Sequence, residues 1–193
     1  MKYAKTVLAY KTRMRRSQQG FSLLEMAVAL GILLIVAVST MSLGALALAT
    51  TENQGHLQAR TAEYAQDKME QLLALSFCDG QTDTTVYPAV GTGGTGLAGC
   101  TNNPNPNIPP TPLAGGGLSF NAPVGRYVDY VDSNGNPTST SGNWQYMRVW
   151  QISLPAGTTL IKQISVACEV RSSVAGQGQF PQTTVIALKS YPF

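Results

Sequence analysis

The hydrophobic pattern of the chain is dominated by one stretch, residues 26–49, which contains no charged side chain. Leucine, isoleucine, valine, alanine and methionine make up most of it. As a helix, a stretch of this length rises about 36 Å, which is enough to cross a hydrocarbon core of about 30 Å. A helix in the core of a globular protein seldom stays apolar on every side for so long. The pattern therefore predicts a membrane-spanning helix over residues 21–50.

The next segment, residues 51–76, has the pattern of a helix with one apolar face. It contains no proline, and apolar side chains recur at spacings of three and four. The residues of this stripe are Ala59, Ala62, Ala65, Met69, Leu72 and Leu73. Four of the charged residues in this segment lie mainly off the stripe: Glu63, Asp67, Lys68 and Glu70. We expect the helix to continue through this segment and to pack its stripe against a sheet.

Residues 124–193 contain four strand-like segments: 126–132, 144–154, 160–170 and 183–189. In the third, alternate residues from Leu160 to Val170 are apolar, with Lys162 as the exception. Three or four antiparallel strands would form a sheet that covers the helical stripe, which is an α+β fold.

Two aspartates in this region fit local structure better than an acid–base pair. We expect Asp129 at a strand edge and Asp132 in a turn around Asn134 and Gly135. Residues 132–143 also resemble part of a calcium loop, but Pro137 stands where that loop needs glycine. We therefore expect a turn and no metal.

Glycine and proline are frequent in residues 77–123. This composition predicts a long irregular connection between helix and sheet. This connection is either a contact surface for a partner or a surface loop without one.

Charge is distributed unevenly along the chain. Residues 1–20 contain six lysines and arginines and no acid, whereas the net charge of the whole chain is only +3. The remaining residues, with seven basic and ten acidic side chains, are therefore net negative, so we infer no nucleic-acid binding. Basic residues before an apolar helix predict a cytoplasmic N-terminus. With one histidine and three cysteines in the chain, we expect no Cys/His-rich zinc site.

The junction between the basic leader and the apolar stretch reads Gly20-Phe-Ser-Leu-Leu-Glu25-Met. This motif resembles the processing site of type IV prepilins. The resemblance implies that a membrane prepilin peptidase cleaves between Gly20 and Phe21 and that Phe21 becomes N-methylated. An ordinary secretory signal, cut near Ala45-Leu46-Ala47, is the competing interpretation. Such signals have shorter apolar regions and no use for the carboxylate of Glu25.

The resemblance also implies a role for Glu25. After cleavage, the Phe21 amine is a cation in apolar surroundings, and the Glu25 carboxylate of an arriving subunit would pair with it and set the register of assembly. From the sequence alone, Glu25 is a single acid at the edge of a membrane helix. The alternative is an acid that reaches the lipid headgroups from a plain anchor.

The exported part of the chain would lie in a compartment that permits disulfides. We favour a Cys78–Cys100 bond, which closes a modest loop, and expect Cys168 as a buried thiol; Cys168 could instead pair with either of the others. His56, the one histidine, falls in the helix, and no catalytic or phosphate-binding constellation is evident.

These patterns predict a structural protein without cofactors or enzymatic activity: a pilin-like subunit, most simply a minor pilin, with residues 1–20 removed. The alternatives are a pseudopilin of a type II secretion system and a tip-located adhesion subunit. The partners would be prepilin peptidase, other pilins and the inner membrane before assembly, with a surface or cargo ligand as a further option. The globular domain would be periplasmic in the single-pass precursor, then part of an extracellular pilus or periplasmic pseudopilus.

Overall fold

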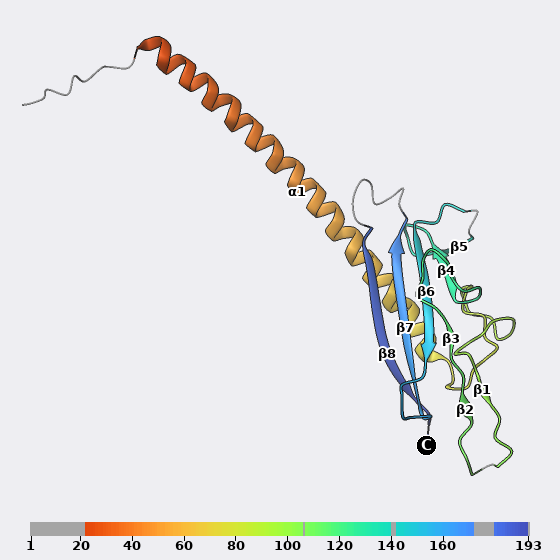
Figure 1. The fold of residues 1–193 in the computed structure, drawn as a ribbon. Coiled ribbons are helices and arrows are strands. Elements are labelled where there is room, and N and C mark those ends of the chain that lie inside the picture. The colour runs from red at the N-terminus through yellow and green to blue at the C-terminus, as the bar shows by residue number, and fades with distance from the viewer. Residues whose placement is uncertain (1–21, 106, 140–141, 172–179, 193) are drawn as a thin grey trace, which may run out of the picture. The chain divides into compact units, whose positions relative to one another are not determined.

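The computed structural model describes residues 22–105, 107–139, 142–171 and 180–192. By internal contacts the chain divides into two units, Met1–Leu48 and Ala49–Phe193. One long helix, α1 (Leu23–Ala74), contributes to both of them (Figure 1). The single helix predicted from the apolar stretch and the stripe after it is therefore confirmed. Its last residue, Ala74, lies four residues before the first cysteine.

In the first unit, α1 is apolar and almost entirely exposed. From Leu23 to Leu48 only Ala37 is even half-buried, and Leu23 and Met41 are 89% and 77% exposed. The hydroxyl groups of Ser39 and Thr40 donate to helix carbonyls three or four residues earlier. Hydroxyls satisfied within the helix are compatible with a hydrocarbon environment. This helix is long and apolar enough to span a membrane.

The second unit is built on an antiparallel sheet in the order β5-β4-β6-β7-β8 (Figure 1). The strands are β4 (Val128–Val131), β5 (Pro137–Thr138), β6 (Tyr146–Ser153), β7 (Ile161–Val170) and β8 (Gln182–Ser190). The four predicted strands are all present, and the α+β class is confirmed. A further short strand, β3 (Gly115–Gly116), pairs with β6.

The core lies between one face of α1 and the inner face of this sheet. Its sheet side includes Trp150, Ile164 and Val166, all fully buried. The buried residues of α1 are Leu57, Thr61, Tyr64, Ala65, Lys68, Met69 and Leu72. At about 25 cal/mol per Å², burial of such large side chains provides most of the folding free energy of the unit.

The predicted helical stripe is partly wrong. Ala59 and Leu73 are exposed, whereas Lys68, which was expected off the stripe, is fully buried. The buried face crosses Thr61 and Lys68 because both have polar partners inside the unit. The hydroxyl of Thr61 bonds to the carbonyl of Gln58 and the hydroxyl of Thr183. A prediction from apolar residues alone therefore put the buried face of the helix at the wrong positions.

The region expected to be an irregular connection is more ordered than its composition suggests. It contains β1 (Cys100–Thr101) paired with β2 (Thr111–Pro112), and also β3. Leu97 is fully buried in the core, and its amide donates to the carbonyl of Asp79 at 2.7 Å. Two-residue strands have no periodicity, so the sequence pattern could not reveal them.

Candidate functional site

The prepilin-like motif is described from Ser22 onward; Gly20 and Phe21 lie outside the described residues. Ser22 directly precedes α1 and caps it. Its hydroxyl oxygen accepts the backbone N–H of Glu25 at 3.2 Å, and its carbonyl accepts the N–H of Met26 at 3.1 Å. Ser-x-x-Glu at a helix start is the capping-box pattern. The motif therefore also defines where the helix begins.

Glu25 lies in the first turn of α1, and its side chain is exposed. A carboxylate at this place is favoured by the unpaired N–H groups and the dipole of the helix N-terminus. The next acid along the chain is Glu52, so residues 26–51 are apolar or uncharged. Within the described part of the first unit, Glu25 is thus the one ionisable side chain on an otherwise apolar surface.

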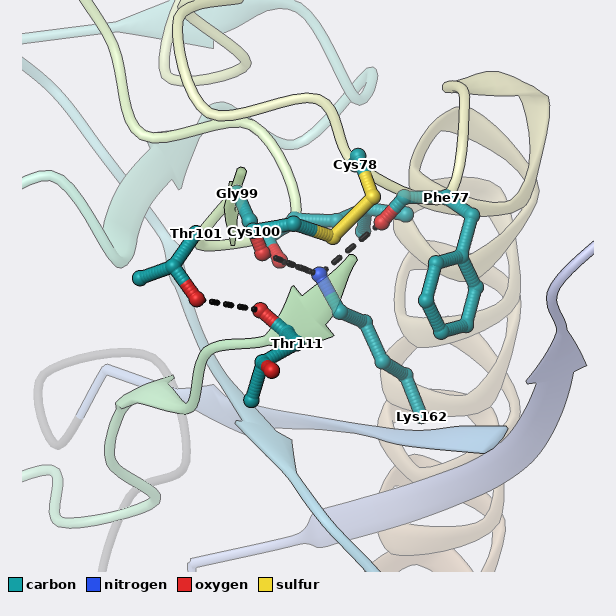
Figure 2. The surroundings of a disulfide bond; sticks show 8 residues. Phe77, Cys78, Gly99, Cys100, Thr101, Thr111 and Lys162 are labelled. Atoms are coloured by element: carbon teal, nitrogen blue, oxygen red, sulfur yellow. Dashed lines mark hydrogen bonds between the residues drawn. A yellow bond between two sulfur atoms is a disulfide. The ribbon is translucent and has the colours of Figure 1, made fainter. Parts of the chain in front are cut away.

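In the second unit, Cys78 and Cys100 are bonded to each other, with an S–S distance of 2.03 Å (Figure 2). The bond joins the segment after α1 to the start of β1. Cys168, on β7, is a free and buried cysteine. Burial raises the pKa of the Cys168 thiol to about 12, so this thiol stays protonated and unreactive at neutral pH.

Lys162 binds the same two segments that the disulfide joins. Its Nζ donates to the carbonyls of Phe77 and Gly99 at 2.9 and 2.7 Å (Figure 2). It also donates to the carbonyl of Leu97 at 2.7 Å. Phe77 and Gly99 each precede one of the bonded cysteines, so Lys162 and the disulfide clamp the same chain segments. Its side chain is fully buried, and burial lowers its pKa to about 8, against the opposing charge of Asp79.

The side chain of Lys162 therefore points inward like its apolar neighbours on β7. Lys162 breaks the apolar alternation of this strand because it has a structural role. A buried ammonium group requires hydrogen-bond acceptors, and the three carbonyls supply them.

A second set of buried charges connects α1 to the sheet. Asp129 accepts hydrogen bonds from Lys68 at 2.7 Å and from two nitrogens of Arg148 at 2.7 and 2.8 Å. Arg148 also donates to the carboxylate of Asp67 at 3.0 Å. Lys68 further donates to the carbonyl of Thr84 and lies 4.3 Å from the centre of the Trp150 ring. We call Lys68, Asp129 and Arg148 the buried charge cluster.

Each charge in this cluster depends on the others. Burial lowers the pKa of Lys68, and the Asp129 carboxylate opposes that shift. Burial also disfavours the charged form of Arg148, but the carboxylates of Asp129 and Asp67 outweigh it and raise its pKa.

Asp129 pairs with Arg148 on β6, whereas β5 pairs only with Tyr130 and Val131, so Asp129 lies beside the end of β5, as the prediction of a strand edge implies. Its burial, at 5% exposed, was not predicted. No local pattern could reveal it, because its partners Lys68 and Arg148 are 61 and 19 residues away.

The turn after β4 forms as expected. The Asp132 carboxylate accepts the backbone N–H groups of Asn134 and Asn136 at 2.8 and 2.9 Å. Gly135 has a φ of 82°, a conformation that favours glycine. A hydrogen bond from the side-chain amide of Asn136, at 3.1 Å, lowers the pKa of Asp132, and the backbone hydrogen bonds lower it further.

Metal-binding and catalytic geometry can be assessed only within the described residues. No group of three or more His, Cys, Asp or Glu side chains there could hold a metal ion. His56 lies on the exposed side of α1.

A family model described as "Prokaryotic N-terminal methylation motif" matches residues 15–41 of the chain. Searches of curated proteins and of solved structures give no match. The matched segment includes the leader–helix junction and two thirds of the apolar stretch 26–49. Together with the long helix on an antiparallel sheet, this match supports a type IV pilin-like protein. The motif implies processing by prepilin peptidase and assembly with other pilins.

Proposed function

We propose that this chain is a minor pilin, a structural subunit of a type IV pilus-like filament, cleaved between Gly20 and Phe21 and methylated on Phe21. The observation that carries the proposal is the methylation motif at residues 15–41, placed directly before an apolar helix with a single carboxylate. Its activity is assembly and not catalysis.

The apolar surface of the first unit supports this activity. Side chains from Leu23 to Leu48 are exposed in the single subunit and need lipid or other helices around them. In the membrane, lipid tails surround them; in a filament, the helices of neighbouring subunits take that place. The same surface thus serves the precursor in the inner membrane and the assembled subunit.

Charge pairing at Glu25 supplies the specificity that an apolar surface lacks. An unpaired carboxylate in hydrocarbon costs up to about 2.5–3.5 kcal/mol on insertion scales. Pairing with the Phe21 amine of the preceding subunit removes this cost at one axial position only. Each arriving subunit therefore stops at the same register.

The topology follows from the leader and the cysteines. The basic residues 1–20 keep the N-terminus in the cytoplasm, and residues 49–193 lie on the periplasmic side. The Cys78–Cys100 bond fits that oxidising compartment.

The test replaces the carboxylate by an apolar side chain of similar size, Glu25→Leu. Glu52→Leu, on an exposed position of the same helix, is the matched control. We expect both precursors to be cleaved, because Glu25 acts after cleavage. Sheared filament fractions should contain the Glu52→Leu protein and lack the Glu25→Leu protein, as judged by immunoblot. Equal incorporation of the two variants contradicts the pairing role.

The pilus assignment is tested by deletion in the native host. We expect fewer surface filaments under the electron microscope and unchanged amounts of secreted protein. Intact filaments with secreted protein retained in the periplasm would instead identify a pseudopilin of a secretion system.

A further inference from the structure

A polar pocket of about 270 Å³ opens on the surface of the second unit. One wall comes from α1, with Glu63, Asp67 and Gln71. The opposite wall is the turn Asn134–Pro137, and Tyr87 completes the lining. Filament assembly through the first unit does not use these residues, so the pocket is unexplained by the proposed function.

One carboxylate of the pocket is both exposed and fixed. The side chain of Asp67 is 55% exposed, yet its Oδ2 accepts hydrogen bonds from Arg148 and Gln71, each at 3.0 Å. Arg148 is itself held by Asp129 within the buried charge cluster and is 3% exposed. A surface carboxylate normally samples many rotamers, whereas this one is positioned before any ligand arrives.

The wall opposite Asp67 is equally rigid. The hydroxyl of Tyr64 donates to the carbonyl of Ser133 at 3.0 Å, and the Asp132 carboxylate holds the amides of the turn. A Cβ on Gly135 would lie 2.8 Å from the Tyr64 ring, so the turn packs directly on that ring. The pocket is therefore preformed, as small-molecule sites usually are.

Tyr87 adds an exposed aromatic ring, carried by a loop whose two ends are hydrogen-bonded to each other. Its side chain is 68% exposed, within an apolar run from Val86 to Val90. The base of this loop is closed by two backbone hydrogen bonds between Asp83 and Val90, at 2.7 and 3.1 Å. An exposed tyrosine without a packing role presents its ring to a ligand that has an apolar face.

We propose that this pocket binds a neutral saccharide. Carboxylate and amide groups accept and donate hydrogen bonds to sugar hydroxyls, and the Tyr87 ring packs against the C–H face of a pyranose. Charge disfavours both ionic classes of ligand. An anion would meet the carboxylates of Glu63 and Asp67. A cation would have to compete with Arg60 and Arg148, which already pair with these two carboxylates.

The test measures binding of monosaccharides to the full chain in micelles of a detergent without a sugar headgroup, such as lauryldimethylamine oxide. Saturation-transfer difference NMR is recorded with galactose, glucose, mannose and N-acetylglucosamine, each titrated through the millimolar range. We expect saturable transfer to the ring protons of at least one sugar. Tyr87→Ala and Asp67→Asn should each weaken that binding about tenfold, the size of one good contact.

Phe180→Ala, which removes another exposed aromatic ring, is the matched control and should leave binding unchanged. Tryptophan fluorescence verifies that each variant is folded. The proposal is overturned by absence of transfer to all four sugars, by equal binding in the Tyr87 and Phe180 variants, or by competition from a blocked lysine peptide, which would identify a cation site. These outcomes are independent of filament assembly.

Discussion

The two halves of helix α1 differ in which side chains they bury. From Leu23 to Leu48 its apolar side chains are exposed, and its one ionisable side chain, Glu25, is exposed as well. From Ala49 to Ala74 one of its charged residues, Lys68, is fully buried against the sheet. The apolar face of the first half needs partners outside the chain, whereas the buried face of the second half has its partners within the second unit. The difference separates a segment made for assembly from a segment made for folding.

Each half of α1 is associated with ion pairing, observed in the second unit and proposed for Glu25 in the first. In the second unit, Asp129 meets Lys68 and Arg148 in the same chain, so the pairing is complete in the monomer. In the first unit, Glu25 has no cationic side chain within the described residues of that unit, and its proposed partner is the amine of another subunit. Removal of each carboxylate should therefore damage a different property.

The largest effect on stability is expected from Asp129→Ala. This change leaves Lys68 and Arg148 buried without their shared anion, and breaking such a cluster costs about 3–5 kcal/mol. Urea unfolding monitored by tryptophan fluorescence measures it, because Trp144 and Trp150 both lie in the second unit. Glu70→Ala, at an exposed position of α1, should stay within about 0.5 kcal/mol of the original protein. Similar losses in the two variants would contradict the importance of the cluster.

The disulfide should contribute somewhat less. Cys78 and Cys100 are 22 residues apart, and the loop-entropy model gives about 3 kcal/mol for a loop of that size. The Cys78→Ser/Cys100→Ser double variant should lose this amount in the same urea experiment. A reductant should destabilise the original protein and leave the double variant unaffected. If the reductant affects both proteins equally, the stabilisation has another origin.

The buried lysine predicts a dependence on pH. The pKa of Lys162 is about 8 in the folded chain, below the ordinary lysine value of 10.5, so between these values the unfolded chain binds more protons. Stability should therefore rise with pH in this window, by roughly 1 kcal/mol between pH 7 and pH 9.

The raised pKa of Cys168, about 12 against an ordinary 9.0, works in the opposite direction above pH 9. The Cys168→Ala variant should continue to gain stability at higher pH. The Lys162→Met variant should show a smaller rise between pH 7 and pH 9, and an unchanged rise would assign the effect to another group.

The smallest effect on stability is expected from Glu25→Leu. The second unit does not use this residue, so the free energy of unfolding reported by Trp144 and Trp150 should change by less than about 0.5 kcal/mol. A large shift would mean that the two units unfold together and that the contrast between the halves of α1 is not one of function.

Periodic features were predictable from the sequence, and polar features of the interior were not. The long helix and the strands β4, β6, β7 and β8 each have an apolar pattern of matching period. The burial of Lys68 depends on Asp129, 61 residues away, and no local pattern records such a pairing. Lys162 differs from Lys68 in this respect. A lysine at an inward position of an alternating strand already indicates that buried hydrogen-bond acceptors lie near it.

The assembly segment shows the reverse situation. Its motif is local, contiguous and readable from Gly20 to Met26, and the matched family model covers it. The pocket beside Asp67 and Tyr87, in contrast, draws on segments from 63 to 148 and has no signature in the sequence. Local chemistry is thus visible in sequence, whereas sites assembled by the fold require the structure.

Whether the chain is processed as a pilin is decided by the intact mass and N-terminal sequence of the protein purified from a host that contains prepilin peptidase. We expect a mature chain that begins at Phe21 and is heavier by one methyl group on its amine. A chain that begins at Met1, or one cut at a secretory site to begin at Thr50, contradicts it.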